Sequence, residues 1–530
     1  MKLKNIVATL IIGASSLGAY AQDGLDNPMT KAVMDVYAQE LANNPNNYEV
    51  LYRRATEYYR FNQYLRALQD ADGAIRNAPA KDKDFCAAAH QLRGEIYQML
   101  DKPAEALADF TKASQLDPTS FISLYQKANC EYELGDYAAA KADYSRLRAM
   151  DPRSAEALTG LARVSVKENN LGNAQQYMDD AVAMMPADSD IYVRRSSVRR
   201  MLGNNTGAVD DLIMAISIDS SSKAFRELVD IAGEDYPAVY TALGNAISQA
   251  PEQGMFYYIR AMIAQAHYHF PAALADFRYI IDNNMYNYAG IYDSMAQCYY
   301  ALCDFDKALE CVNRAISMSA ENTSFFLTLA RIQRAQGLKK EALANINKVL
   351  TKDARNEEAL TEKGISLFGL ERYEEASILF GEMIMDTPDK ALPYMMQAWV
   401  LNDGMAQSAK AMQVYRRMLD AIPAENSTDP QSLRGFAQLF TNDKEGALRW
   451  AEELVKVKDT DGRRNYIAAC LAAQAGESAL ALAYASDAMK LGYADKYQWT
   501  IYDAARVNVA PLRRGNALTE TMARYAYIFE

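Results

Sequence analysis

Residues 121–152 read FISLYQKANCEYELGDYAAAKADYSRLRAMDP, and this stretch decides the fold. Apolar and small residues recur at the spacing of one helix face, first before the break at Gly135-Asp136 and again after it. The residues that carry this pattern are Leu124, Ala128, Tyr132, Ala140 and Tyr144. Asp151-Pro152 ends the second segment, because a proline ring removes an N–H and restrains the residue before it. The stretch therefore predicts two amphipathic helices joined by a turn.

The same pattern returns along the chain at an interval of 34 residues. Small residues keep this interval at Ala106, Ala140, Ala174 and Ala208, and larger ones follow at Phe110, Tyr144, Met178 and Leu212. Prolines keep it at Pro118, Pro152 and Pro186. Further along, the interval returns at Ala296, Ala330, Gly364 and Ala398, and at Ala308, Ala342 and Ala376. Recurrence of residue size together with spacing predicts an array of helix pairs.

These residues resemble the tetratricopeptide repeat family, whose motif combines small residues at fixed places with aromatic residues and a closing proline. In the unit from Phe121, Glu131 stands where the motif has an aromatic residue, with Tyr132 beside it. The resemblance covers roughly nine tenths of the chain after its first 21 residues. It implies an all-α fold, a right-handed superhelical solenoid of antiparallel helix pairs.

The repeat anchors divide the chain into successive segments. We expect a signal peptide at 1–21, a leading segment with a lone helix at 22–47, repeats at 48–220, a degenerate repeat at 221–253, repeats at 254–424, degenerate and repeat-like units at 425–494, and capping helices at 495–530.

The first 21 residues have the features of a cleaved secretory signal. Lys2 and Lys4 precede an apolar run that ends in Ala19-Tyr20-Ala21, which predicts a cut after Ala21. We expect a periplasmic or secreted protein of the exported bacterial type. No later stretch has the length of apolar residues that a bilayer span requires, so the mature chain is expected to lack a transmembrane segment and to associate with the envelope peripherally if at all.

Composition excludes several classes of function. With 530 residues the chain is too long for one compact core, and its net charge of −12 disfavours nucleic acid as a partner, because phosphate binding needs a basic surface. The sequence has no phosphate-binding Gly-Lys-Ser loop, no His-Glu-x-x-His, no Gly-x-Ser-x-Gly and no Cys-x-x-Cys. We therefore expect no enzymatic activity, no cofactor and no metal.

Three smaller features are interpreted as structural. His267 and His269 are expected in a surface turn, and the acidic pairs Asp210-Asp211 and Glu374-Glu375 on solvated helix faces. A cluster of cysteines falls in one unit, at Cys298, Cys303 and Cys311. It is compatible with a disulfide or with small buried apolar side chains, and both readings stay open.

Function is expected on the concave face of the solenoid, which the first helix of each repeat lines. The resemblance implies that wall-facing positions of these helices contact an extended protein or peptide partner. Those positions hold Tyr52, Tyr59, Tyr125, Asn129, Tyr132, Arg163, Arg194, Arg200, Tyr258, Met262, Tyr300, Arg331, Arg334, Phe368 and Trp399. Tyrosine, tryptophan and arginine are the residue types that dominate binding energy at protein interfaces.

The sequence thus predicts a non-catalytic scaffold or adaptor of the bacterial cell envelope that binds extended, acidic or carboxyl-terminated peptide segments. A periplasmic chaperone or secretion accessory for outer-membrane or secreted clients is the alternative, because surfaces rich in methionine and tyrosine adapt to many partners. A glycan-binding module ranks last, since three tryptophans are too few and too dispersed for a row of sugar platforms.

Overall fold

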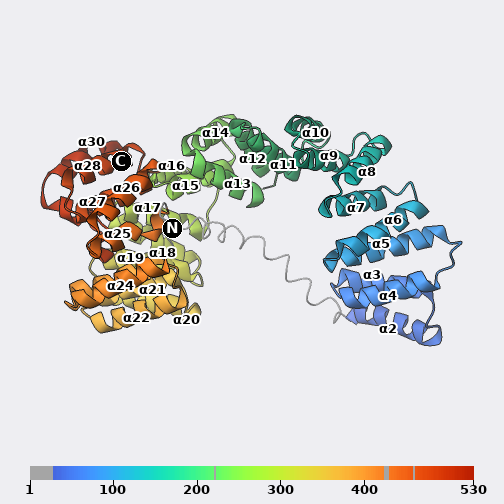
Figure 1. Ribbon diagram of the computed structural model, residues 1–530, viewed down its shortest axis with the longest axis horizontal. Coiled ribbons are helices and arrows are strands. Elements are labelled where there is room, and N and C mark those ends of the chain that lie inside the picture. The colour runs from blue at the N-terminus through green and yellow to red at the C-terminus, as the bar shows by residue number, and fades with distance from the viewer. Residues whose placement is uncertain (1–27, 220–221, 423–428, 458–459) are drawn as a thin grey trace. The chain divides into compact units, whose positions relative to one another are not determined.

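The computed structural model describes residues 28–219, 222–422, 429–457 and 460–530 (Figure 1). Throughout these residues the regular elements are helices, and none of them is a strand. The predicted all-α fold of paired helices is confirmed. The predicted signal peptide at 1–21 lies outside the described residues.

The described chain forms two compact units, one up to Leu228 and one from Val229 onward, and we call them the N-terminal and the C-terminal unit. Helix α13 (Ser222–Glu234) contains the boundary. The other helices of the N-terminal unit are α2 (Pro28–Asn43), α3 (Tyr48–Arg60), α4 (Tyr64–Asn77), α5 (Lys83–Met99), α6 (Pro103–Leu116), α7 (Phe121–Glu133), α8 (Tyr137–Met150), α9 (Ala155–Lys167), α10 (Leu171–Met184), α11 (Ser189–Met201) and α12 (Asn205–Asp219).

The C-terminal unit continues the helix pairs. Its regular pairs are built from α14 (Tyr236–Gln249), α15 (Gly254–Ala266), α16 (Phe270–Asp282), α17 (Ala289–Ala301), α18 (Phe305–Met318), α19 (Thr323–Ala335), α20 (Lys339–Lys352), α21 (Glu357–Gly369), α22 (Tyr373–Asp386), α23 (Ala391–Trp399), which runs on into the π-helix η2 (Val400–Gly404), and α24 (Ser408–Ala421).

The last part of the C-terminal unit is less regular. It contains η4 (Pro430–Ser432), α25 (Arg434–Phe440), α26 (Lys444–Lys456), α27 (Arg463–Gln474), α28 (Ser478–Lys490), α29 (Lys496–Thr500), η5 (Ala504–Arg506), η6 (Ala510–Arg514), α30 (Ala517–Arg524) and η7 (Ala526–Ile528). The segment at 221–253, expected to be degenerate, holds the helices α13 and α14. The elements after residue 495 are short.

Local sequence sets where the helices begin and where the chain turns. Ser120 accepts a hydrogen bond from the backbone N–H of Ser123 at 3.2 Å, and Asp136 accepts one from Ala139 at 3.0 Å, so both cap a helix start. The turns inside successive pairs need a left-handed residue 34 positions apart. These residues are Asp101, Gly135, Asn169 and Gly203, with φ of 56°, 85°, 58° and 76°.

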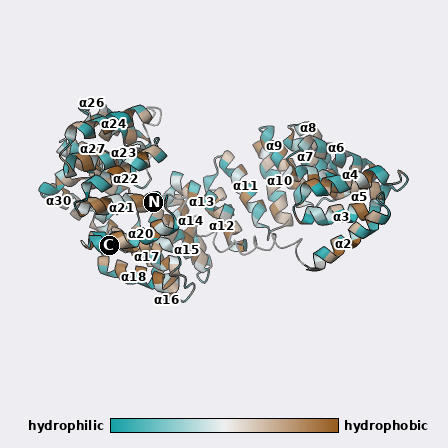
Figure 2. Cartoon of the chain, turned by 90° about the horizontal axis from the view of Figure 1, so that it is seen from below, coloured by the Kyte–Doolittle hydropathy of each residue, from teal (hydrophilic) through white to brown (hydrophobic). Residues whose placement is uncertain are grey.

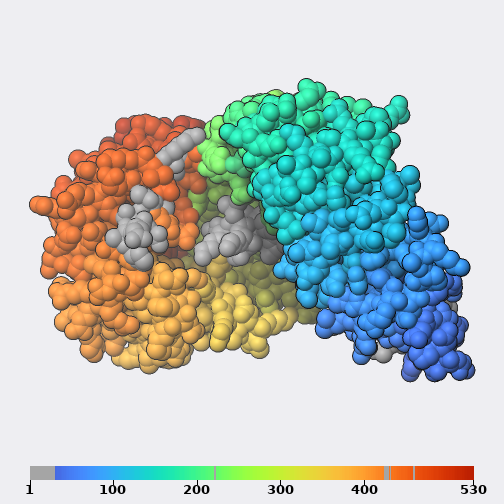
Figure 3. All heavy atoms as spheres, turned by 45° about the vertical axis from the view of Figure 1, so that its right-hand side comes forward, coloured from blue at the N-terminus to red at the C-terminus, as the bar shows by residue number. Residues whose placement is uncertain are grey.

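The residues that define the repeat lie in the core. Ala106, Ala140, Ala174 and Ala208 are fully buried, and so are Phe110, Tyr144 and Leu212 four residues after three of them. Neighbouring helices pack within a pair and between pairs, as α8 does on α7 and α9. Figure 2 shows brown and teal on the same helices, in keeping with one apolar stripe per helix. In Figure 3 the N-terminal unit forms an unbroken stack from blue to teal.

A partly buried ion pair links the two helices of many repeats, and it was not predicted from the sequence. An aspartate on the second helix pairs with a basic residue 16 positions earlier on the first, in Arg54–Asp70, Arg93–Asp109, Lys127–Asp143, Arg195–Asp211 and Arg260–Asp276. Asp211 is only 2% exposed, so the expectation that Asp210-Asp211 is a solvated pair was wrong for Asp211. A constant spacing of basic and acidic residues was the signal available in the sequence.

No helix in the described part of the chain combines the length and the apolar character needed to cross a bilayer.

Candidate functional site

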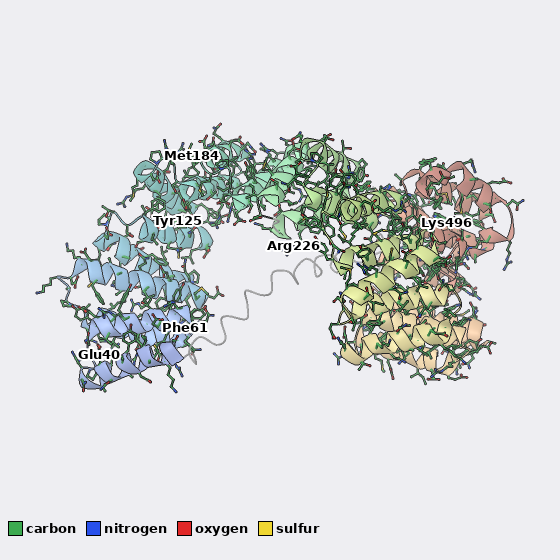
Figure 4. The ribbon with its side chains drawn as sticks, turned by 180° about the vertical axis from the view of Figure 1, so that it is seen from behind. Glu40, Phe61, Tyr125, Met184, Arg226 and Lys496 are labelled. Atoms are coloured by element: carbon green, nitrogen blue, oxygen red, sulfur yellow. The ribbon has the colours of Figure 1, made fainter. Side chains whose placement is uncertain are left out.

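The first helices of successive repeats contact one another and form a continuous row in each unit. In the N-terminal unit the row is α3, α5, α7, α9 and α11, which we call the N-terminal wall. Polar contacts join its members: Ser123 Oγ donates to Gln91 Oε1 at 3.0 Å, and Gln98 Nε2 donates to Gln126 Oε1 at 3.3 Å. Figure 4 places Tyr125 of α7 on the inner edge of the curved stack and Met184 at its outer edge.

One end of the N-terminal wall is aromatic and carries a carboxylate. Tyr52 packs edge to face on Phe85, with ring centroids 5.4 Å apart. Burial raises the pKa of both Tyr52 and Tyr59, and the nearby negative charge of Glu95 raises it further. Glu95 accepts a hydrogen bond from Gln91 at 3.1 Å, and burial raises its own pKa. Glu95 was not among the predicted wall residues, although its place on a first helix beside two predicted tyrosines could have pointed to it.

The middle of the wall joins three predicted residues. The Arg163 guanidinium lies 4.1 Å from the centroid of the Tyr132 ring, a cation–π distance, and its Nη1 donates to Asn129 Oδ1 at 3.3 Å. Asn129 Oδ1 also accepts from the hydroxyl of Tyr144 at 2.6 Å. Asn129 therefore fixes Arg163 from α7, one repeat away.

Tyr125 stands beside this group on α7. Its ring centroid lies 6.5 Å from that of Phe121 in a stacked arrangement and 6.3 Å from that of Tyr144 at a steep angle. Tyr125 is half-buried, so part of its ring faces solvent.

Two further arginines extend the wall along α11. Arg194 is exposed and Arg200 is half-buried. Within the described residues no carboxylate lies within ion-pair distance of Arg163 or Arg194, whereas Arg195 of the same helix is neutralised by Asp179 and Asp211. The N-terminal wall thus presents uncompensated positive charge at Arg163 and Arg194, on a protein whose net charge is −12.

The matching row in the C-terminal unit, which we call the C-terminal wall, is α15, α17, α19, α21 and α23. Its two predicted arginines are already paired. Arg331 Nε and Arg334 Nε each lie 3.0 Å from a carboxylate oxygen of Glu362, and Arg331 also reaches Glu358 at 3.3 Å. Burial alone would raise the pKa of Glu362, but the charges of Arg334 and Arg331 outweigh it and lower that pKa. These arginines are held by the protein itself.

The remaining predicted residues of the C-terminal wall are packed. Tyr258, Met262 and Trp399 are each 6% exposed. Phe368 and Trp399 stack with ring centroids 3.8 Å apart. Tyr300 has its ring centroid 4.6 Å from that of Tyr497, which belongs to α29 near the end of the chain. The structure therefore spreads the predicted residues over two walls, and leaves accessible side chains in the N-terminal one.

The histidine pair is not in a surface turn, which corrects the expectation from sequence. His267 is 5% exposed, and the ring of His269 stacks on Tyr236 with centroids 4.4 Å apart. Burial lowers the pKa of both histidines to about 4, so both are neutral near pH 7. The turn is covered by residues from later in the chain, an arrangement that no local pattern could indicate.

The cysteines are free thiols in the described structure: Cys130, Cys298 and Cys470 are buried, and Cys86, Cys303 and Cys311 are partly accessible. Within the described residues no three side chains of His, Cys, Asp or Glu are grouped so that they could hold a metal ion.

Comparison with known proteins supports the repeat assignment directly. Residues 87–120, 125–190 and 289–322 each match a model described as "Tetratricopeptide repeat". These ranges fall on the helix pairs that begin at α5, α7 and α17.

Curated relatives match parts of the chain. Over 164 residues it is 29% identical to "Superkiller complex protein 3" of Homo sapiens, and the aligned region covers 30% of this chain and 10% of that protein. Over 296 residues it is 22% identical to "DnaJ homolog subfamily C member 7" of Homo sapiens, and the aligned region covers 55% of this chain and 56% of that protein. The chain thus spans less than two thirds of either relative.

Among solved structures, yeast Tom70 aligns with 76% of this chain and 95% of its own, at 16% identity and a TM-score of 0.34.

Proposed function

Because the chain is a tetratricopeptide repeat protein, we propose that it is a non-catalytic scaffold that binds an extended polypeptide along the N-terminal wall. The observation that carries this proposal is the pair Arg163 and Arg194, whose charges no described carboxylate compensates. Both lie on a row of first helices that also presents Tyr125 and Tyr132. Large rings and guanidinium groups supply contact area and hydrogen bonds at little cost in rotamer entropy.

The partner's chemistry follows from the charges along the wall. Arg163, Arg194 and Arg200 suit an acidic segment or a terminal carboxylate, because guanidinium groups bind carboxylates through paired hydrogen bonds. At the other end of the N-terminal wall, Glu95 lies near Tyr52 and Tyr59. This site suits a side chain of the partner that is mostly apolar and carries one hydrogen-bond donor. The wall therefore favours one orientation of an asymmetric peptide.

The compartment belongs to the proposal as well. The leader at 1–21 supports export, and we place the scaffold in the bacterial cell envelope, with partners among envelope proteins. Crosslinking in intact cells followed by mass spectrometry identifies the partner and the compartment together.

The binding test then uses the partner segment that crosslinks to the wall. The double variant Arg163→Ala/Arg194→Ala is expected to weaken binding of that segment about tenfold or more, because charge-assisted hydrogen bonds contribute about 1.5 to 3 kcal/mol each. Arg200→Ala, added to the double variant, is expected to weaken it further. Titration calorimetry of the full chain gives the dissociation constants.

A matched control removes a cation outside the wall. Arg153 is exposed in the turn between α8 and α9, and Arg153→Ala is expected to leave the affinity unchanged. If the double variant, still helical by circular dichroism, binds its partner as tightly as the Arg153→Ala protein does, the proposed wall is not the binding site.

An exported chaperone or secretion accessory is the second candidate, because large apolar side chains are exposed on several helices of the N-terminal unit. They include Met99, Met150, Met184, Met185, Met201 and Met214. Methionine adapts its shape to many surfaces, which suits a chaperone. Recovery of many unrelated clients in the crosslinking experiment favours the chaperone, whereas one stoichiometric partner favours the scaffold.

A further inference from the structure

The C-terminal wall is covered by a segment from the end of the same unit. This segment comprises residues 492–506, including α29 and η5, and we call it the C-terminal segment. Figure 4 labels Lys496, the first residue of α29, where the red end of the chain meets the repeats drawn in yellow-green.

The contacts follow the order of the repeats. At the α15–α16 turn, the ring centroids of Tyr493 and Tyr268 lie 4.6 Å apart, and the backbone N–H of Ala494 donates to the Tyr268 carbonyl at 3.3 Å. At the C-terminal end of α17, Tyr497 packs on Tyr300.

The contacts then continue past the end of α17 and reach η2, which belongs to the last pair of the wall. Just after α17, Thr500 Oγ1 lies 3.8 Å from Cys303 Sγ. Arg506 Nε lies 3.0 Å from Asp403 Oδ2 in η2. The C-terminal segment therefore passes the C-terminal ends of α15 and α17 and reaches η2, so its contacts follow the order of the repeats along the wall.

Tyr497 is the anchor of this contact. It is 3% exposed, its ring lies against Tyr300, and its hydroxyl accepts a hydrogen bond from Arg334 Nη1 at 3.1 Å. Arg334 is fixed in turn by Glu362. An aromatic side chain in a pocket, with a polar tip bound by a fixed arginine, has the features of an interface hot spot.

The start of the C-terminal segment fits equally closely. Gly492 has φ of +92°, and a Cβ at this position would lie 2.0 Å from Cε1 of His269. Only glycine allows this approach to the covered histidine. Apolar packing is continuous as well, since Trp399 of the wall and Trp499 of the C-terminal segment belong to the same buried cluster.

We propose that residues 492–506 act as an intramolecular ligand that fills the C-terminal wall and closes it to other polypeptides. A tethered ligand competes at an effective concentration on the order of millimolar, so a free peptide of ordinary affinity cannot displace it. Peptide binding is then confined to the N-terminal wall. This last step rests on the proposed function, whereas the closure of the C-terminal wall does not.

The closure is tested with a crosslink that the structure makes available. Thr500→Cys in the full chain places a second thiol beside the native Cys303. Oxidised glutathione is expected to join the two in an intramolecular disulfide, each thiol losing its hydrogen while the oxidant is reduced to two glutathione molecules. Mass spectrometry of the non-reduced digest identifies the 303–500 link.

The matched control is Ile501→Cys. Ile501 follows Thr500 in the chain and is 39% exposed. The contact with Cys303 is made by Thr500 and not by Ile501. We expect the Thr500→Cys protein to crosslink at least tenfold faster than the Ile501→Cys protein. Equal rates, or no link in the Thr500→Cys protein, would show that the C-terminal segment does not stay on the wall in solution and would overturn the proposal.

A second measurement tests whether the C-terminal wall takes part in binding the partner segment. The crosslinked Thr500→Cys chain is expected to bind the partner segment with the same dissociation constant as the reduced chain. A fluorescent peptide of residues 492–506 is expected not to bind the wild-type chain. Loss of partner binding on crosslinking, or binding of the added peptide, would mean that the wall opens and would contradict the closure.

The two proposals fail in different ways. If the crosslink forms but Arg163→Ala/Arg194→Ala has no effect on partner binding, the proposed function is wrong and the closure stands. If the arginine variant loses binding but no crosslink forms, the closure is wrong and the N-terminal site stands.

Discussion

Asp211 illustrates what a single buried charge does in this protein. Burial raises the pKa of Asp211 even though Arg195 and Arg199 lie within ion-pair distance and act to lower it. Desolvation therefore outweighs attraction, and the pair is not in itself a large source of stability. What it provides is neutralisation: without the aspartate, two partly buried arginines lose their main counter-charge.

We therefore expect Asp211→Ala to lower the free energy of unfolding by about 3 kcal/mol, the cost typical of breaking a buried pair from one side. The neighbouring Asp210 is exposed, so Asp210→Ala should change stability by less than about 0.5 kcal/mol. Urea denaturation followed by circular dichroism measures both. Similar losses in the two variants would contradict the buried network.

Equivalent turns of successive repeats hold different residue types. Glu371 has φ of +62°, at the turn position that Gly337 holds with φ of +84°. A left-handed conformation costs an L-residue about 1 to 2 kcal/mol, partly offset by the greater freedom of glycine in the unfolded chain. We expect Glu371→Gly to stabilise the protein by about 0.5 to 1 kcal/mol.

The reciprocal variant Gly337→Ala should destabilise by about 1 kcal/mol. Thermal denaturation of both variants measures the pair, and a loss of stability in Glu371→Gly would show that the left-handed turn is not strained.

At the scale of elements, small residues set how closely helices cross. Ala140 is fully buried where α8 packs on α7 and α9, whereas Ala139 is only half-buried on the same helix. Short helices are marginal alone, so their stability comes from these crossings.

We expect Ala140→Leu to cost about 1 to 3 kcal/mol by overpacking, and Ala139→Leu to cost less, because its extra carbons can reach solvent. Chemical denaturation of the two proteins compares them at constant composition. Equal effects at both positions would refute the register of α8.

In the whole molecule, the walls of the two units share one architecture but differ in charge and in what occupies them. In the C-terminal unit, arginines of the wall are neutralised by Glu362 and Glu358 and the wall is occupied by the chain itself. In the N-terminal unit, no described carboxylate lies within ion-pair distance of Arg163 or Arg194. The net charge of −12 does not prevent an acidic segment from binding there, because charges beyond about 8 Å are largely screened at physiological ionic strength.

Local sequence is enough to specify the repeat and its helix pairs. Recurring alanines, capping residues such as Ser120 and turn residues such as Gly135 act through neighbours on the same or the next helix, so a period of 34 residues is enough to locate them. The same local register predicted that Tyr125 and Arg163 lie on first helices, and the structure has them on α7 and α9.

Which wall is filled depends on contacts between distant parts of the chain. Tyr300 and Tyr497 are almost 200 residues apart, and Tyr268 meets Tyr493 over a longer stretch still. No periodic pattern encodes such contacts, because they arise when the irregular end of the chain folds back on the repeats. The burial and the contacts of Arg334, of the two histidines and of Trp399 therefore depend on packing between distant segments. The local spacing of residues holds no information about that packing.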